Sequence, residues 1–132
     1  MIHPNSEISE FDIIIIGATG DLSIRKIIPA LFKRYADGQI PEKSKIYCLA
    51  RQKLDNSSFT QKISQQNKKD FKNSKILKEF FDKINYLCID IKSPDSKNLF
   101  SLQKMLTKDR VRLFYLATAP ELFGVSAHFI RE

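Results

Sequence analysis

The strongest chemical signal in the sequence is a pair of glycines, Gly17 and Gly20, between an apolar segment and a segment with helical spacing. Glycine lets the backbone turn tightly and approach a ligand without a Cβ atom in the way. The helix that follows offers unpaired amides and the positive end of its dipole, both of which bind phosphate. The Thr19 hydroxyl can also donate to a phosphate oxygen. This spacing predicts a site for the pyrophosphate of a dinucleotide; the alternative is a turn that uses glycine for geometry alone.

The glycine pattern differs from the common GxGxxG fingerprint of dinucleotide-binding proteins. Thr19 stands at the place of the second glycine and Leu22 at the place of the third. The pattern is instead Gly17, Gly20 and a small residue, Ser23, which allows close packing of the helix on the strand. The flanking strand and helix patterns supply the context that the fingerprint requires.

Arg51 and Gln52 give the second signal, because they directly follow an apolar segment at residues 46–50. A site selective for NAD usually has an acidic residue here, which binds the ribose hydroxyls and repels a 2′-phosphate. Arginine instead provides a planar fork of donors that fits a phosphate, and Gln52 can assist it. We therefore expect a preference for NADP, with an ordinary exposed arginine on a surface loop as the alternative.

Apolar segments that alternate with helical segments predict an α/β, Rossmann-like fold, in which helices flank a parallel sheet. The expected strands span residues 12–16, 46–50, 85–89 and 111–117. The expected helical regions are residues 21–36, with a kink or new start at Pro29; 57–82, broken near 68–73; 93–107; and from 120 onward. Right-handed crossovers place the strand exits at one edge of the sheet, where ligands bind. These exits are residues 17–22, 51–52, 90–91 and 118–123.

Length and composition favour a single domain. The 132 residues are 42% hydrophobic, enough for one core, with residues 1–10 as a flexible polar tail and residues 11–132 as the domain. No segment is long and apolar enough to span a bilayer and the first residues do not resemble a signal peptide, so we expect a cytoplasmic protein without a membrane partner. Cys48 and Cys88 have no metal-ligand spacing, which indicates reduced core thiols rather than a metal site or a disulfide.

The net charge of +7 comes from scattered lysines, many of them in residues 64–83, where acidic residues are interspersed. We interpret this segment as the solvated face of a helix, although a basic surface also steers polyphosphates toward a site. Nucleic-acid binding requires a groove-reading element or an aromatic stacking platform, and the sequence offers neither. No nucleic-acid partner is therefore expected.

Four ordered segments resemble the glucose-6-phosphate dehydrogenase family. They are GATGDL at 17–22, followed by Lys26 and Pro29; LARQKL at 49–54; CIDIK at 88–92; and FYLATAPELFG at 114–124. The likeness covers residues 11–132 but only the front of the family's coenzyme domain, so it implies a truncated coenzyme-binding domain that lacks the substrate domain. It further implies NADP-dependent oxidation of glucose 6-phosphate at C1, which gives 6-phosphogluconolactone and opens the oxidative pentose phosphate pathway.

The resemblance also assigns roles to individual positions. Arg51, with Gln52, would hold the 2′-phosphate, Asp90 and Ile91 would lie near the adenosine end, and Lys26 would point toward the junction of coenzyme and sugar phosphate. The pyrophosphate would be cradled by Gly17, Ala18, Thr19, Gly20, Asp21, Leu22, Ser23 and Ile24. Three positions depart from the family: Ile24 replaces a usual lysine, Phe123 replaces a tyrosine of some members, and Gln52 is similar to members that accept both coenzymes. NAD is therefore allowed beside NADP.

The family's catalytic segments, RIDHYLGKE and EKPFG, do not occur in this sequence, so no catalytic residue is assigned. General base catalysis requires a group within hydrogen-bond reach of the proton, and neither His3 nor His128 has a suitable setting. We expect glucose 6-phosphate to bind only if a substrate domain is supplied; the alternative is a stand-alone NADP-binding module or an inactive remnant. A sheet that stops here leaves an unpaired edge, which predicts marginal stability or self-association through that edge.

Overall fold

The computed structural model describes residues 11–69, 71, 74–90, 96–106 and 111–117. Its elements follow the expected alternation, and every strand begins and ends within one residue of its expected position. In chain order they are β1 (Phe11–Ile16), the π-helix η1 (Ser23–Ile27), α2 (Ile28–Ala36), β2 (Ile46–Ala50), α3 (Asn56–Gln66), α4 (Lys75–Phe81), β3 (Ile84–Cys88), α5 (Ser96–Met105) and β4 (Val111–Leu116). The expected tail at 1–10, Ile91, Phe123 and the helix from residue 120 lie outside the described residues.

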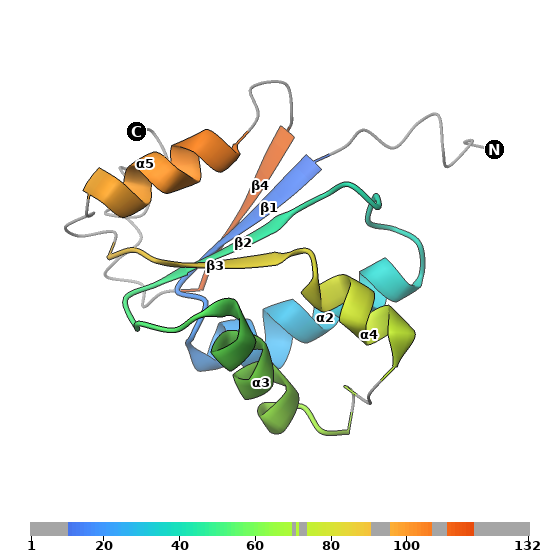
Figure 1. Ribbon diagram of the computed structural model, residues 1–132. Coiled ribbons are helices and arrows are strands. Elements are labelled where there is room, and N and C mark those ends of the chain that lie inside the picture. Colours follow the sequence, from blue (N-terminus) through green and yellow to red (C-terminus); the bar gives the residue numbers. More distant parts are fainter. Residues whose placement is uncertain (1–10, 70, 72–73, 91–95, 107–110, 118–132) are drawn as a thin grey trace.

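The four strands form one parallel sheet in the order β3-β2-β1-β4. Helices α2, α3 and α4 cover one face of the sheet and α5 covers the other (Figure 1). The strand order reverses between β1 and β4, because the chain adds β2 and β3 on one side of β1 and then crosses over to the other side. This arrangement confirms the Rossmann-like fold, which binds ligands beside the point of reversal.

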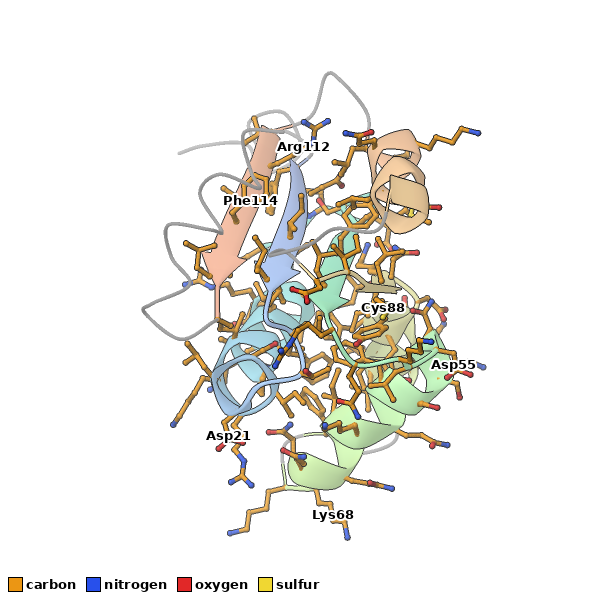
Figure 2. All side chains as sticks on the ribbon, turned by 90° about the vertical axis from the view of Figure 1, so that its left-hand side faces the viewer. Asp21, Asp55, Lys68, Cys88, Arg112 and Phe114 are labelled. Atoms are coloured by element: carbon orange, nitrogen blue, oxygen red, sulfur yellow. The ribbon has the colours of Figure 1, made fainter. Side chains whose placement is uncertain are left out.

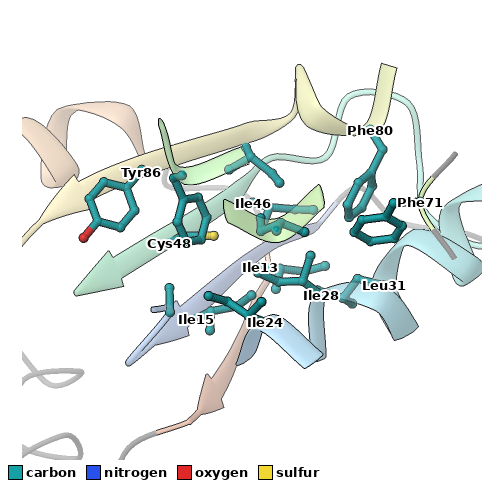
Figure 3. Close-up of a cluster of buried hydrophobic side chains, with 14 of the residues drawn as sticks. Ile13, Ile15, Ile24, Ile28, Leu31, Ile46, Cys48, Phe71, Phe80 and Tyr86 are labelled. Carbon is teal, nitrogen blue, oxygen red and sulfur yellow. The ribbon is translucent and has the colours of Figure 1, made fainter. Parts of the chain in front are cut away.

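The isoleucines of β1 explain why this strand reads as a continuous apolar run. Ile13 and Ile15 belong to the core cluster beneath α2, α3 and α4, whereas Ile14 and Ile16 belong to the cluster on the α5 face. All four side chains are buried. Figure 3 shows the larger cluster, in which Ile24, Ile28 and Leu31 pack from the helical side against the sheet. A strand covered on both faces needs no polar alternation.

The expected helix over residues 21–36 is continuous, and its backbone keeps helical dihedral angles at Ile27 and Ile28, so no new helix starts at Pro29. The change before Pro29 is one of hydrogen-bond register, in the π-helical turn η1. In η1 the Ile28 N–H donates to the Ser23 carbonyl, five residues back. Pro29 has no N–H, so it cannot extend this register to the Ile24 carbonyl. Asn67, which follows α3, donates from Nδ2 to the Ile24 carbonyl at 2.9 Å instead. The helix ends as expected, with Gly38 just beyond it at a φ of 78°.

One lysine of the basic segment departs from the expected solvated face. Lys83 is buried, and its ammonium donates to the carbonyls of Pro41, Glu42 and Ser44 in the loop before β2. The ammonium also lies over the Tyr35 ring, 5.1 Å from its centroid. Burial lowers the pKa of Lys83, and the carbonyls and the ring compensate for the water that the ammonium loses.

Both cysteines lie in strands, Cys48 in β2 and Cys88 at the end of β3, and both are free thiols. Across the described ranges, no group of three or more His, Cys, Asp or Glu residues is placed to hold a metal ion. The helices that the structure describes include none with the length and apolar character needed to cross a membrane.

Candidate nucleotide-binding site

Backbone hydrogen bonds bring the exits of all four strands to one edge of the sheet. The Gly17 N–H, after β1, donates to the Leu49 carbonyl of β2 at 2.9 Å, and the Ala117 N–H, after β4, donates to the Ile16 carbonyl at 2.8 Å. The Ile89 N–H, after β3, donates to the Ala50 carbonyl at 2.9 Å. The turn after β1 therefore lies between the exits of β2 and β4, beside the reversal of strand order.

The glycine turn is held in place by β2. Gly17 has a φ of 85°, a conformation that residues with a Cβ atom rarely adopt. This conformation allows the amides of both Gly17 and Ala18 to donate to the same Leu49 carbonyl, at 2.9 and 3.0 Å. The Gly20 N–H closes the turn by donating to the Gly17 carbonyl at 3.1 Å. These three amides are thus engaged by the protein itself.

Three other amides of the loop are available to a ligand. The N–H groups of Thr19, Asp21 and Leu22 have no hydrogen-bond acceptor within the part of the chain that the structure describes, and their residues are exposed or half-buried. They surround the first turn of the helical segment, where backbone donors lack helical partners and the dipole is positive. The Ile24 N–H, one turn on, already donates to the Gly20 carbonyl at 3.0 Å.

Gly20 lies between the Gly17 and Ala117 carbonyls, and a Cβ atom here would make only ordinary contacts with them. A Cβ atom at this position would lie 3.4 Å from the Gly17 carbonyl oxygen and 3.8 Å from that of Ala117. The missing Cβ and the three amides without an acceptor among the described residues fit a diphosphate group, which needs close backbone approach and several N–H donors. The residues present therefore fit the phosphate part of a dinucleotide.

The side chains of the predicted pyrophosphate residues divide into two groups. Ala18, Ser23 and Ile24 are buried against the sheet, so their side chains cannot reach a ligand, and the Ser23 Oγ finds no partner among the described residues. Asp21 and Leu22 are exposed, and Asp21 projects outward at the helix start (Figure 2). The Asp21 carboxylate lies 3.6 Å from the Arg25 guanidinium in an exposed ion pair. Lys26 is also exposed, on η1.

Arg51 and Gln52 lie at the exit of β2 with exposed side chains. Their carbonyl groups are bound from β3: the Tyr86 hydroxyl donates to the Gln52 carbonyl, and the Cys88 thiol donates to that of Arg51 at 3.2 Å. The sequence alone did not identify Tyr86 and Cys88 as contacts of the site. Their spacing of two residues places both side chains on the same face of β3, and this spacing is a signal that could have found them. Asp90 is half-buried just beyond β3.

Groups of the kind that can bind phosphate thus lie in two places at this edge, the turn after β1 and the exit of β2. The Leu49 carbonyl of β2 accepts from the amides of that turn and so joins the two places. Both histidines of the sequence, His3 and His128, lie outside the described residues. The described groups at this edge are suited to binding and orienting a nucleotide, and none of them is a histidine that could serve as a general base.

A family model and the curated relatives of this chain all point to the same family. Residues 14–132 match the family model described as "Glucose-6-phosphate dehydrogenase, NAD binding domain". Glucose-6-phosphate 1-dehydrogenase of Gluconobacter oxydans is 34% identical over 125 residues, which cover 89% of this chain and 25% of that protein. The enzyme of the same name from Rhizobium meliloti is 32% identical over 131 residues, which cover 95% and 26%. The chain therefore spans about a quarter of the length of these curated relatives.

Solved structures agree with this result. A glucose-6-phosphate dehydrogenase in complex with its substrate glucose-6-phosphate superposes with a TM-score of 0.77 and 29% identity, over 92% of this chain and 27% of that one. Glucose-6-phosphate 1-dehydrogenase from Mycobacterium avium superposes with a TM-score of 0.79 over 94% of this chain and 27% of that one. At 18% identity, the second structure supports the fold alone.

Proposed function

Because this chain belongs to the glucose-6-phosphate dehydrogenase family and matches its NAD-binding domain, we propose that it binds NADP at the carboxyl edge of its sheet. The observation that carries the proposal is the set of amides at Thr19, Asp21 and Leu22, which have no acceptor among the described residues and lie beside the reversal of strand order. These amides would bind the pyrophosphate. Gly17 and Gly20 would allow the backbone to approach it closely.

We assign the choice of coenzyme to Arg51. Its exposed guanidinium stands at the exit of β2, next to the turn that would hold the pyrophosphate. A guanidinium binds a phosphate through parallel hydrogen bonds, whereas an acidic residue at this position would repel it. Gln52 carries no charge, so it would not prevent NAD from binding as a weaker ligand. NADP is the expected preferred coenzyme.

For a whole protein that contains this domain, we propose NADP-dependent oxidation of glucose 6-phosphate at C1 to 6-phosphogluconolactone. The coenzyme would supply the hydride acceptor when bound, and the residues described above would fix its phosphates. Removal of the C1 hydroxyl proton requires a base within hydrogen-bond reach. We assign that base, and the sugar-phosphate site, to a substrate domain.

Calorimetric titration of the chain with NADP and NAD tests the binding proposal. Arg51→Ala removes a charge-assisted contact worth about 1.5 to 3 kcal/mol, so affinity for NADP should fall roughly tenfold to a hundredfold while affinity for NAD stays unchanged. Arg34→Ala is the matched control, because Arg34 is also an exposed arginine, in the last turn of α2 and away from the strand exits.

Two outcomes would count against the proposal. Folded wild-type chain that shows saturable binding of neither coenzyme would refute coenzyme binding itself. Equal loss of NADP affinity in Arg51→Ala and Arg34→Ala would refute a specific 2′-phosphate contact, since both variants lower the net charge by the same amount.

A further inference from the structure

Strand β3 and the residue that follows it bind three consecutive carbonyl groups at the exit of β2. The Ile89 N–H donates to the Ala50 carbonyl at 2.9 Å, the Cys88 thiol to the Arg51 carbonyl at 3.2 Å, and the Tyr86 hydroxyl to the Gln52 carbonyl. The first is a backbone contact that continues the parallel pairing. The other two come from side chains, and such side-chain contacts are not needed to extend a sheet.

We propose that Tyr86 is a positioning residue for coenzyme choice, because its hydroxyl fixes the backbone from which the Arg51 guanidinium projects. This inference rests on the proposed role of Arg51 as the 2′-phosphate ligand. Tyr86 itself does not touch the coenzyme in this scheme. It acts through the Gln52 carbonyl, one residue beyond Arg51.

The Tyr86 hydroxyl can serve this purpose because the core holds its ring. Tyr86 is buried, and its ring packs against Phe59 with 4.8 Å between the centroids. Figure 3 shows the hydroxyl at the edge of the buried cluster, on the side toward which the strands run. The Tyr86 hydroxyl is a protonated donor at neutral pH, as an ordinary tyrosine is, and burial raises its pKa further, to about 12.

The contact should matter for NADP and not for NAD. Arg51 is an exposed, flexible side chain, and binding a phosphate costs it conformational freedom. The Arg51 and Gln52 carbonyls are both held by β3, which restricts the backbone that carries the guanidinium. The free protein then samples fewer guanidinium positions, so binding the phosphate costs less conformational entropy. NAD has no 2′-phosphate, so its affinity does not depend on where the guanidinium lies.

The test is the ratio of NAD to NADP dissociation constants in Tyr86→Phe, which keeps the ring and removes only the hydroxyl. We expect affinity for NADP to fall about threefold to tenfold, the equivalent of one hydrogen bond, with NAD unchanged. Tyr47→Phe is the matched control. Tyr47 is a buried tyrosine of β2 whose hydroxyl donates to the Met105 carbonyl at 3.2 Å, on the opposite face of the sheet. It should leave both dissociation constants unchanged.

Cys88→Ala provides a second variant, since it removes the thiol donor to Arg51 without altering the tyrosine ring. It should shift the ratio in the same direction by a smaller factor. An unchanged ratio in Tyr86→Phe, or equal weakening of both coenzymes, would overturn the inference and leave the hydroxyl a stabilising contact only.

Arg51→Ala separates failure of this inference from failure of the proposed function. Selective loss of NADP in Arg51→Ala, together with an unchanged ratio in Tyr86→Phe, would keep the 2′-phosphate contact and reject the positioning role. No selective loss in Arg51→Ala would reject both.

Discussion

Asn67 supplies the hydrogen bond that Pro29 cannot make. The effect of replacing Asn67 on the free energy of unfolding should therefore depend on which residue occupies position 29. Asn67 is 9% exposed, and its Nδ2 donates to the Ile24 and Ile63 carbonyls, each at 2.9 Å. Ile24 is buried, so in Asn67→Ala its carbonyl is left without this donor. An unsatisfied buried acceptor costs about 1–3 kcal/mol, and we expect the free energy of unfolding to fall by about 2 kcal/mol.

The cost of Asn67→Ala should depend on residue 29. Pro29→Ala restores an N–H that can donate to the Ile24 carbonyl, five residues back, in the register of the Ile28 to Ser23 bond. Asn67→Ala should therefore cost about 1 kcal/mol less when alanine occupies position 29. Urea unfolding of the four proteins in the double-mutant cycle, followed by far-ultraviolet circular dichroism, measures this difference.

Ser74→Ala is the control for this cycle, because the Ser74 hydroxyl caps α4 by accepting from the Leu77 N–H at 3.2 Å and does not contact the η1 carbonyls. Loss of such a cap costs about 1 kcal/mol, and it should cost the same in both residue-29 backgrounds. Equal costs of Asn67→Ala in both backgrounds would refute the idea that Asn67 substitutes for the missing proline N–H.

Three further results are expected. Gly17→Ala forces a Cβ onto a φ of 85° and should lower the free energy of unfolding in urea by about 1–2 kcal/mol, whereas Gly20→Ala should cost less, because its Cβ meets no atom closer than 3.4 Å. The raised pKa of Tyr86, about 12 against an ordinary 10, means that the folded chain keeps a proton which the unfolded chain loses. The resulting stability is complete below pH 10 and disappears as the pH rises through 12, so the difference in urea midpoint between wild type and Tyr86→Phe should shrink over that interval. Burial raises the pKa of the Cys48 thiol, so a thiol reagent should modify the half-buried Cys88 in the folded chain and Cys48 only after unfolding; simultaneous reaction of both would contradict the described burial.

The parts of the fold that follow from local pattern could be predicted from the sequence. Residues 46–50 form a strand because an apolar run of that length between polar segments suits a buried strand, and Gly17 has the positive φ that a tight turn requires. The position of Arg51 at the edge of the sheet follows in turn, because the exits of parallel strands lie together.

The contacts that fix the site have no such local signal. Asn67 meets the Ile24 carbonyl across 43 residues, and Tyr86 meets Gln52 across 34 residues. Such pairings depend on how helices and strands pack in three dimensions. Each is a single hydrogen bond, and it leaves no repeating pattern in the sequence from which it could be predicted. Lys83 departs from the expected solvated face for the same reason: in the sequence it resembles its solvated neighbours, and only the packed loop before β2 provides its three carbonyl acceptors.

The pairing of β1 also sets an order of events during synthesis. One side of β1 meets β2 at Ile13 and Ile46, but the other side meets β4, where Phe11 pairs with Val111, 100 residues later. A ribosome must therefore release most of the domain while one edge of an isoleucine-rich strand still lacks its neighbour. Such an edge is a template for association with other nascent chains. Pairing with β4 covers this edge of β1, so substitutions in Val111–Leu116 should reduce the yield of soluble protein in cells more than their effect on the stability of the folded domain would suggest.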